Sequence, residues 1–222
     1  MKKELKNPGA SVRQKLLNLS REKREDFNYT LNRYAIERFL FRLGNSESAE
    51  RFILKGAMLF LYWGIDSYRQ TRDIDLLMFG NDNLAELEGI FKSICRLPVE
   101  EDGLIFRENS VTGEIIRDSQ EYGGVRIFLK GNLDTAVVRL QFDIGFGDSI
   151  TPQPVEASMP VLLTAFPAPH LKIYPPETVI AEKFEAMVKL GMANSRMKDF
   201  FDIWILSQGF KNYAMTKTLK IP

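Results

Sequence analysis

The stretch Thr71-Arg-Asp-Ile-Asp-Leu-Leu-Met-Phe79 decides how this 222-residue chain is interpreted. Its apolar second half, closed by a glycine and an asparagine, predicts a buried strand over residues 73–79. Because side chains alternate across a strand, Asp73 and Asp75 leave one face and the apolar residues leave the other. Charged residues are rarely buried unless they are paired or bound to a metal, and Mg²⁺ prefers carboxylate oxygens. The pair therefore predicts a site for a divalent cation.

A second acidic strand is predicted further along the chain. In Val138-Arg-Leu-Gln-Phe-Asp-Ile144 the apolar residues alternate with Gln141 and Asp143, which share the other face. If this strand pairs with the first, three carboxylates converge. Such a set can hold one or two Mg²⁺ ions that align a nucleoside triphosphate with an attacking hydroxyl group.

A glycine turn precedes both strands. The stretch Leu54-Lys-Gly-Ala57 ends a short apolar run and opens an apolar helix over residues 57–63. A strand that ends at Gly56 and opens a helix brings backbone N–H groups to a phosphate, helped by the helix dipole. Each signal alone is weak. The order of glycine turn, Asp-x-Asp strand and later acidic strand nevertheless favours a site for phosphate transfer.

The remaining pattern predicts an α+β chain in three segments. Residues 1–50 are expected to be helical, residues 51–150 to form the core, and residues 151–222 to form a connector and a C-terminal helical region packed with that core. Seven of the ten prolines lie in residues 151–176, where no regular helix or strand is expected. The other expected elements are helices over 83–96, 177–190 and 196–207 and strands over 104–107, 111–117, 124–130 and 136–145.

Composition is that of an ordinary soluble globular protein, with 45% apolar and 27% charged residues. The single Cys95 excludes an internal disulfide and suits the cytoplasm, and the single His170 excludes a multi-histidine metal site. No apolar run reaches the ~18 residues of a membrane span. Residues 1–42 carry eleven Lys or Arg against five Asp or Glu. This arm either contacts nucleic acid or an acidic partner, or is a solvated helical face.

Charged positions in the C-terminal helices are candidates for the same site. Lys183 falls inside the apolar arc of its predicted helix, so it is either a rim residue that reaches solvent or a cation aimed into a cleft, where it would bind phosphate. Asp199 and Asp202 are i, i+3 neighbours on the next helix. They are either solvated helix acids, a base or orienting group for the acceptor hydroxyl, or structural partners of Lys183 or Lys198.

The order of these motifs resembles that of the nucleotidyltransferase superfamily. Their residue sequences resemble those of the AbiEii/AbiGii-type toxin family of bacterial abortive-infection and toxin–antitoxin systems. The resemblance extends over about residues 11–207 and is specific as a set, although each piece is short. The matching stretches are Ser11-Val-Arg-Gln-Lys-Leu-Leu-Asn18, Arg33-Tyr-Ala-Ile-Glu-Arg-Phe-Leu40, Leu54-Lys-Gly-Ala-Met-Leu-Phe60, Thr71-Arg-Asp-Ile-Asp-Leu-Leu77, Gln141-Phe-Asp-Ile-Gly-Phe-Gly-Asp148, Ala181-Glu-Lys-Phe-Glu-Ala-Met187 and Ser195-Arg-Met-Lys-Asp-Phe-Phe-Asp202.

The resemblance implies a nucleotidyltransferase fold, which is a mixed sheet with flanking helices, extended by helical segments at both ends. It also implies roles for particular residues. Those expected to bind the metal are Asp73, Asp75 and Asp143. Those expected to act in catalysis are Asp73, Asp75, Lys183, Asp199 and Asp202. Those expected to bind the nucleotide are Gly56, Ala57, Thr71, Arg72, Lys183 and Lys198.

The implied activity is a Mg²⁺-dependent transfer of a nucleoside monophosphate from an NTP to an acceptor hydroxyl, with RNA, such as a tRNA end, as the suggested acceptor. The activity would arrest growth, and an antitoxin would relieve that arrest. The antitoxin is expected to be a small winged-helix protein encoded beside the toxin. Two alternatives stay open. One is a nucleotidyltransferase that modifies a small molecule or a protein side chain, which the near-zero net charge fits slightly better. The other is an inactive nucleotide-binding or partner-binding module, because Ala57 replaces the Gly or Ser that the superfamily prefers.

Overall fold

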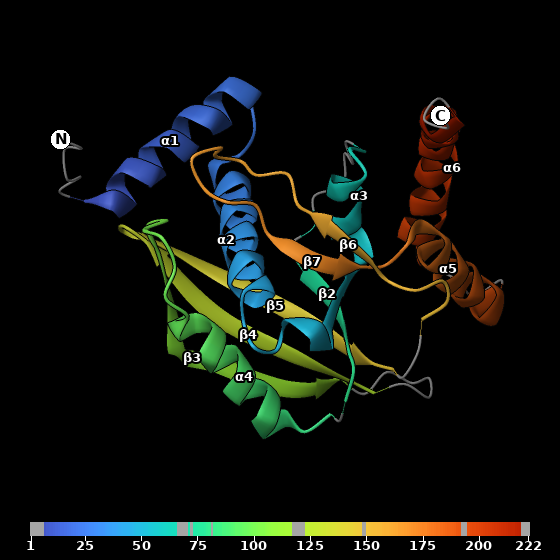
Figure 1. Ribbon diagram of the computed structural model, residues 1–222, viewed down its shortest axis with the longest axis horizontal. Helices are drawn as coiled ribbons and strands as arrows, with labels where there is room; N and C mark the ends of the chain where they lie inside the picture. The colour runs from blue at the N-terminus through green and yellow to red at the C-terminus, as the bar shows by residue number, and fades with distance from the viewer. Residues whose placement is uncertain are drawn as a thin grey trace.

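The computed structural model describes residues 7–65, 71, 73–80, 82–116, 123–147, 150–191 and 195–218. Within these residues the chain forms one seven-stranded mixed sheet with the order β3-β4-β5-β2-β1-β7-β6 and flanking helices (Figure 1). This architecture confirms the predicted α+β class. The strands are β1 (Phe52–Lys55), β2 (Asp73–Met78), β3 (Leu104–Ile116), β4 (Gly124–Leu133), β5 (Ala136–Phe146), β6 (Val155–Ser158) and β7 (His170–Ile173). The helices are α1 (Pro8–Lys23), α2 (Phe27–Gly44), α3 (Leu59–Tyr62), α4 (Leu84–Arg96), α5 (Pro176–Leu190) and α6 (Met197–Thr218), with the 3₁₀ turns η1 (Ala49–Arg51) and η2 (Gly56–Met58).

The first two helices begin at capping residues. The Asn7 side chain accepts a hydrogen bond from the backbone N–H of Ala10, and the Asp26 side chain accepts from the first turn of α2. Such caps satisfy N–H groups that have no partner inside the helix. The second helix ends at Gly44, and Asn45 follows as its C-cap.

Aromatic side chains join α2 and α4 to the sheet. Phe39 of α2 stacks with Phe91 of α4 at 5.5 Å between ring centroids, and both rings contact Phe142 of β5, at 4.6 and 5.0 Å. Tilted and edge contacts of this kind add ~0.5–1.5 kcal/mol each beyond the burial of apolar area. One face of the sheet is therefore closed by these helices, whereas the side chains that alternate with the buried ones on β4 and β5 are exposed or partly exposed.

The register of β2 fixes the positions of the acidic residues. β2 pairs in parallel with β5, so that Asp73 lies opposite Gln141 and Asp75 lies opposite Asp143. The strand pairing on which the sequence prediction depended is therefore confirmed. The residues of β2 on the other face, buried in the core as predicted, are Ile74, Leu76 and Met78.

The proline-rich segment corrects a prediction. Residues 151–176 contain two strands, β6 and β7, where the sequence predicts none. The prolines lie outside both strands, with Pro154 just before β6 and Pro169 just before β7. β7 pairs in parallel with β1, and β6 forms the edge of the sheet. Because a proline interrupts a strand only where it stands, a high proline density does not exclude short strands between prolines.

Three other elements differ in length from the prediction. The two strands expected over 104–107 and 111–117 are one strand, β3, whose ladder with β4 shifts register between Arg107 and Thr112. Such a bulge interrupts the alternation that the sequence shows. The helix expected over 57–63 is a 3₁₀ turn followed by a single α-helical turn, and α6 continues to Thr218.

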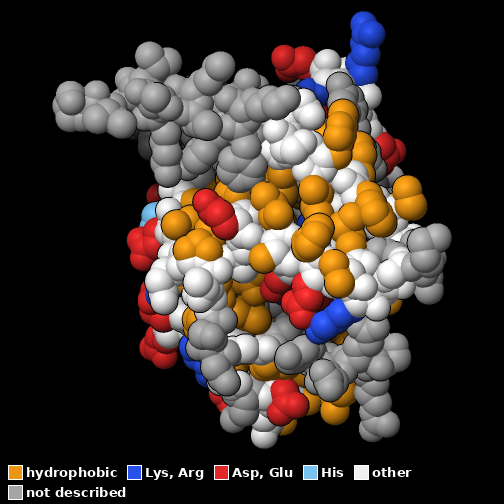
Figure 2. Space-filling model, turned by 90° about the vertical axis from the view of Figure 1, so that its right-hand side faces the viewer, with side chains coloured by type: hydrophobic (Ala, Val, Ile, Leu, Met, Phe, Trp, Pro, Cys, Tyr) orange, Lys and Arg blue, Asp and Glu red, His pale blue; other side chains and the backbone are white. Residues whose placement is uncertain are grey.

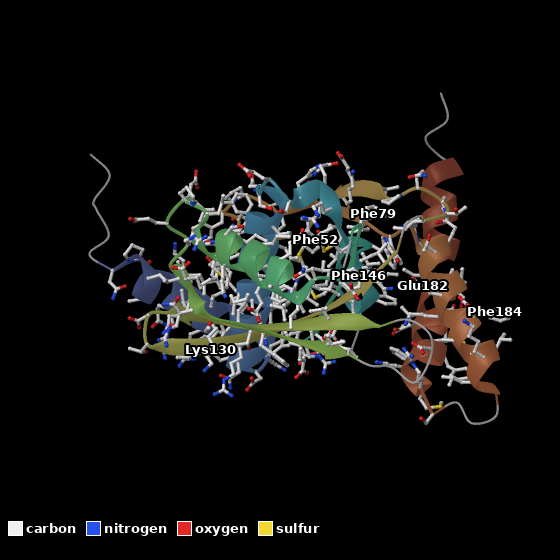
Figure 3. The ribbon with its side chains drawn as sticks, turned by 90° about the horizontal axis from the view of Figure 1, so that it is seen from below. Phe52, Phe79, Lys130, Phe146, Glu182 and Phe184 are labelled. Atoms are coloured by element: carbon white, nitrogen blue, oxygen red, sulfur yellow. The ribbon has the colours of Figure 1, made fainter. Side chains whose placement is uncertain are left out.

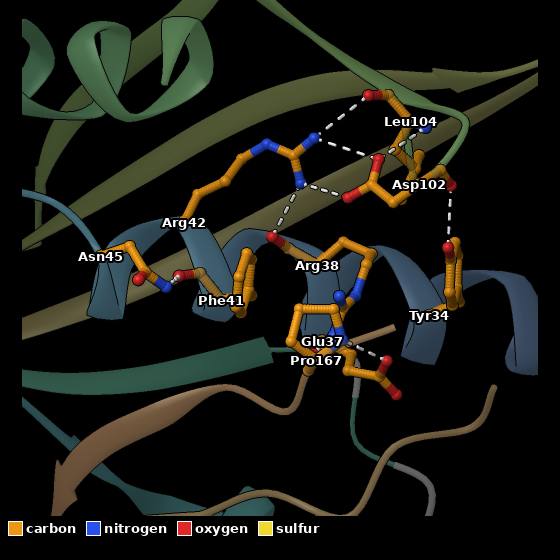
Figure 4. A network of polar contacts seen from close by, with 9 residues as sticks. All are labelled: Tyr34, Glu37, Arg38, Phe41, Arg42, Asn45, Asp102, Leu104 and Pro167. Carbon is orange, nitrogen blue, oxygen red and sulfur yellow. Dashed lines mark hydrogen bonds and ion pairs between the residues drawn. The ribbon is translucent and has the colours of Figure 1, made fainter. Parts of the chain in front are cut away.

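Charged residues of α2 lie in the core (Figure 4). Arg42 donates hydrogen bonds to both carboxylate oxygens of Asp102, at 2.7 and 3.1 Å, and to the carbonyl oxygens of Arg38 and Leu104. The hydroxyl of Tyr34 donates to the carbonyl oxygen of Asp102 at 2.8 Å. The network fixes α2 to the segment that leads into β3.

The two C-terminal helices, α5 and α6, pack together at the end of the molecule away from α1 (Figure 1). Their outer surface is apolar, since Phe184, Val188, Met197 and Trp204 are each more than half exposed, and Figure 2 shows apolar side chains gathered on this face. In the described part of the chain, no helix combines the length and the apolar character needed to cross a membrane.

Candidate active site

Gly56 ends β1 in a left-handed conformation and lies against Asp75. Its φ angle is +72°, a value that glycine adopts without steric cost. A Cβ atom here would come within 1.9 Å of Asp75 Oδ2. A residue with a side chain would therefore displace the carboxylate, so the glycine turn and the acidic strand form one unit.

Asp75 lies in an environment that disfavours its charge. Burial, and to a smaller degree the carboxylate of Asp143, raise the pKa of Asp75 from 3.8 to about 6, against the opposing effect of Lys55 and Lys198. Asp73 adds to the rise as the smallest of these causes. Within the described residues, the side chain of Asp75 takes part in no hydrogen bond or ion pair. A bound cation would relieve this repulsion between acids.

Lys55 lies directly opposite Asp75 across β1 and β2. Its amine is 3.0 Å from a carboxylate oxygen of Glu182 on α5 and 5.1 Å from the centroid of the Tyr174 ring. The hydroxyl of Tyr174 donates to the same carboxylate at 3.0 Å. Figure 3 shows Glu182 on the side of α5 that faces the sheet, whereas Phe184 points away. Glu182 therefore ties α5 to the end of β1.

Lys183 is held between two acids of α6. Its amine lies 3.0 Å from Asp199 Oδ1 and 2.8 Å from Asp202 Oδ2. Both aspartates are 1% exposed, and Arg196 Nε lies 2.8 Å from the other oxygen of Asp199. Lys183 is thus no rim residue that reaches for solvent, and Asp199 and Asp202 are not solvated helix acids. Instead, the three side chains lock α5 onto α6.

These residues surround a cleft of about 290 Å³ between the sheet and α5–α6. A second hollow of about 660 Å³ adjoins it, shares Lys55, Asp75 and Glu182 with it, and contains Asp143. A groove of about 730 Å³ is lined by Asp73 but not by Asp75. The two acids of the Asp-x-Asp strand therefore open onto different hollows. The charged or motif residues that line the first cleft are Lys55, Gly56, Ala57, Asp75, Glu182, Lys183, Arg196, Lys198 and Asp199.

Asp143 is engaged by an arginine from the neighbouring strand. Arg126 Nε and Nη2 donate to its two carboxylate oxygens at 2.7 and 2.8 Å, and Gln141 Nε2 donates to one of them at 3.2 Å. Within the described residues, no group of three or more His, Cys, Asp or Glu side chains is arranged to hold a metal ion. The candidate donors for a divalent cation are Asp73 and Asp75, because Mg²⁺ is commonly bound by one or two carboxylates together with substrate phosphates and water.

Comparison with known proteins identifies the family. The model of the family described as nucleotidyl transferase AbiEii toxin, Type IV TA system, matches residues 38–220. The chain belongs to this family. The matched region includes the whole sheet, the cleft with its adjoining hollow and both C-terminal helices, and it confirms the resemblance found in the sequence. A search of curated proteins gives no match.

Two crystal structures from Helicobacter pylori are similar to this member of the AbiEii family. One is JHP933, with 19% sequence identity, a TM-score of 0.47 and coverage of 77% of this chain and 62% of that one. The other is a candidate nucleotidyltransferase, with 20% identity, a TM-score of 0.46 and coverage of 77% and 64%. The chain thus spans a little less than two thirds of the length of either protein.

The other residues that the AbiEii resemblance singled out take different places. Thr71 Oγ1 donates to the carbonyl oxygen of Asp73 at 3.2 Å, at the start of β2. Arg72 lies outside the described residues. Asp202 contacts Lys183 but does not line the cleft, and Asp143 lines only the adjoining hollow.

Four charged residues of this site were not predicted from the sequence. Lys55, Glu182 and Arg196 stand beside Gly56, Lys183 and the Lys198–Asp199 pair in their motifs, and that proximity was the available signal. Arg126 carries a weaker signal, since it occupies an outward-facing position in a predicted strand. Its contact with Asp143 follows from the register between β4 and β5, which the alternation of residues does not specify.

Proposed function

We propose that this protein transfers a nucleoside monophosphate from an NTP to an acceptor hydroxyl and releases pyrophosphate. The acceptor oxygen bonds to the α-phosphorus as the bond from that phosphorus to the β-phosphate oxygen breaks, and the acceptor proton passes to a carboxylate of the site or to water. The convergence of Gly56, Asp75, Lys183 and Lys198 on one cleft carries this proposal. Membership of the nucleotidyl transferase AbiEii family supports it.

The cleft offers fixed positive charge to a triphosphate. Lys183 is a good phosphate ligand because its amine is already positioned by Asp199 and Asp202 and need not reorganise during the reaction. Lys198 lines the same cleft and is close enough to Asp75 to lower its pKa. In this proposal Asp199 and Asp202 position Lys183, and the N–H groups at the Gly56 turn approach the phosphates.

The acid pair of β2 is the candidate site for a divalent cation. Asp73 and Asp75 would hold it together with phosphate oxygens, and the cation would neutralise phosphate charge and align the attack. Asp143 remains the third candidate ligand. It can join the cation only by exchanging its contacts with Arg126.

The biological role proposed for this activity is that of a toxin whose partner is an antitoxin, which the type IV toxin–antitoxin family supports. An RNA acceptor and a winged-helix antitoxin are the finer parts of the proposal. The cationic side chains of the cleft exceed its acidic ones, which suits a phosphate-bearing substrate: Lys55, Lys183, Arg196 and Lys198 face Asp75, Glu182 and Asp199.

The proposal is tested with purified protein, Mg²⁺ and each NTP labelled at the α-phosphate. Total RNA, a protein extract and a small-molecule extract are offered separately as acceptors. We expect label in RNA with one or more NTPs, and none when the cation is chelated. Label in the protein or small-molecule fraction would keep the transfer and change the acceptor.

A matched variant separates chemistry from misfolding. Lys198→Met removes one cation of the cleft that makes no ion pair in the described part of the chain, so the fold should persist while transfer falls at least tenfold. Absence of transfer by the folded wild type with every NTP and every acceptor fraction would contradict the proposal.

A further inference from the structure

The exposed face of β3, β4 and β5 carries a row of three cations. Arg107 lies opposite Lys130 across β3 and β4, and Lys130 lies opposite Arg139 across β4 and β5. All three residues are exposed. Figure 3 labels Lys130 on this sheet, with α4 on the opposite side. At an inter-strand spacing of ~4.8 Å the row extends over roughly 10 Å.

Such a row needs an explanation, because like charges directly opposite each other destabilise a sheet. In the described part of the chain none of the three side chains forms an ion pair. The acid of this face on β3, Glu114, lies 3.9 Å from Arg126 and not in the row. The row is therefore a concentration of positive charge that the fold itself does not neutralise.

The row leads directly to the candidate active site. Arg139 is two residues from Gln141 on the same face of β5, a distance of ~7 Å along the strand, and Gln141 lies opposite Asp73. Phe128 of β4 lies opposite Gln141 on the other side and is 37% exposed. The groove of about 730 Å³ includes Arg139, Phe128, Gln141 and Asp73 in its lining.

The exposed face thus has an order along the strands. The cation row comes first. The next set of cross-strand neighbours is Phe128, Gln141 and Asp73, and the one after it is Arg126, Asp143 and Asp75. The phosphate-binding cleft with Lys183 lies beyond Asp75, and the groove opens at Asp73. Two substrates can therefore reach the acid pair from opposite sides.

We propose that the cation row and the groove bind the backbone of a single-stranded RNA acceptor, whose reactive end lies at Asp73. This inference rests on the proposed transfer activity and identifies the surface that the acceptor uses. Cations that track a backbone, interleaved with an exposed aromatic ring for a base, are the combination used to bind single strands. Charge complementarity favours this occupant over an apolar or basic partner.

Binding of a fluorescent single-stranded RNA is measured by anisotropy at several salt concentrations. The test variant is R107Q/K130Q/R139Q. The matched control removes three exposed cations from α1, as K15Q/R21Q/K23Q, and changes the net charge equally. Each phosphate contact on a single strand contributes ~0.7 to the slope of log affinity against log salt, so the test variant should lose ~2 from that slope. Its affinity should fall at least tenfold, and the control should bind like the wild type.

Stabilisation by Mg²⁺ and NTP, followed by melting temperature, provides the second readout. The test variant should keep it, because none of its three changes lies in the cleft. Equal losses of RNA affinity in test and control variants would overturn the inference, as would an unchanged affinity in the test variant. Transfer of label by a wild type that does not bind RNA would also overturn it, and the proposed activity would stand. RNA binding through the row without transfer to any acceptor would keep the surface and reject the activity.

Discussion

The charged cluster of α2 is buried, the charged cluster of the cleft is largely half-buried, and the two are built differently. Around Arg42 the guanidinium is matched to a carboxylate and to two carbonyl oxygens, so nothing is left for a ligand (Figure 4). Around Asp75 a carboxylate lies between Lys55 and another acid, with a raised pKa and an open cleft beside it. Buried charge that is fully matched indicates a structural role, whereas half-buried charge left unmatched beside a cleft indicates a ligand site.

The largest effect is expected from breaking the matched cluster. Arg42→Met leaves Asp102 as a buried acid with its main partner removed, which should lower the free energy of unfolding by ~3–5 kcal/mol. Chemical denaturation measures it. R42M/D102L should recover part of the loss, because an apolar pair replaces both charges. Transfer per folded molecule should not change in either variant. A loss of transfer in well-folded protein would place this network in the active site.

Substitution of the unmatched carboxylate, Asp75, is expected to stabilise the metal-free protein and not to destabilise it. With a folded pKa of about 6 against 3.8, Asp75 carries a cost that is absent below about pH 4 and complete above about pH 6. Without metal, Asp75→Asn should therefore raise the free energy of unfolding by ~3 kcal/mol at pH 8 and by almost nothing at pH 3.5. Denaturation across this pH range measures it, with the exposed Asp82→Asn as control. Destabilisation at pH 8 would make Asp75 a structural partner.

A smaller destabilisation is expected at Gly56. Gly56→Ala places a left-handed residue against Asp75, whereas Gly64→Ala creates the same backbone strain at φ +64° with no heavy atom within 4 Å of the new Cβ. The backbone strain alone costs ~1 kcal/mol, so Gly64→Ala should lower the free energy of unfolding by about that amount. Gly56→Ala should lower it by about twice as much. The difference between their unfolding free energies isolates the contact with Asp75. Equal losses would show that the carboxylate moves aside freely.

The smallest effect on stability is expected at Arg126, whose ion pair is partly exposed and should contribute less than ~1 kcal/mol. Arg126→Gln frees the carboxylate of Asp143 beside Asp75, so Mg²⁺ should bind the NTP-free protein several-fold more tightly. Calorimetric titration with Mg²⁺ measures this. Lys130→Gln, which removes a cation from the same face of β4, is the control. An unchanged Mg²⁺ affinity would exclude Asp143 from the cation site.

The acid pair was accessible from the sequence because strand periodicity alone places Asp73 and Asp75 on one face and their neighbours in the core. The partners of these acids were not accessible in the same way. Lys55 and Arg126 meet Asp75 and Asp143 through strand register, and alternation is compatible with more than one register. Register comes from packing across the whole sheet.

The prediction for the charged residues of α5 and α6 was incomplete for a related reason. The helical position of Lys183 predicted that it faces inward or lies at a rim, and tertiary contacts with α6 determine which. The buried charges of α2 were not predicted at all, because a charged residue in an amphipathic pattern is assigned to the solvent face by default. Arg42 and its partner Asp102, for example, are 60 residues apart in the chain.

The central claim is that the cleft beside Asp75 transfers a nucleoside monophosphate, and the position of the label tests it most directly. Wild-type protein and Asp75→Asn are incubated with Mg²⁺, total RNA and an NTP labelled at either the α- or the γ-phosphate. We predict that α-label enters RNA with the wild type, that γ-label appears only in released pyrophosphate, and that the folded variant transfers neither. Transfer of γ-label, or undiminished transfer of α-label by Asp75→Asn, would contradict this account.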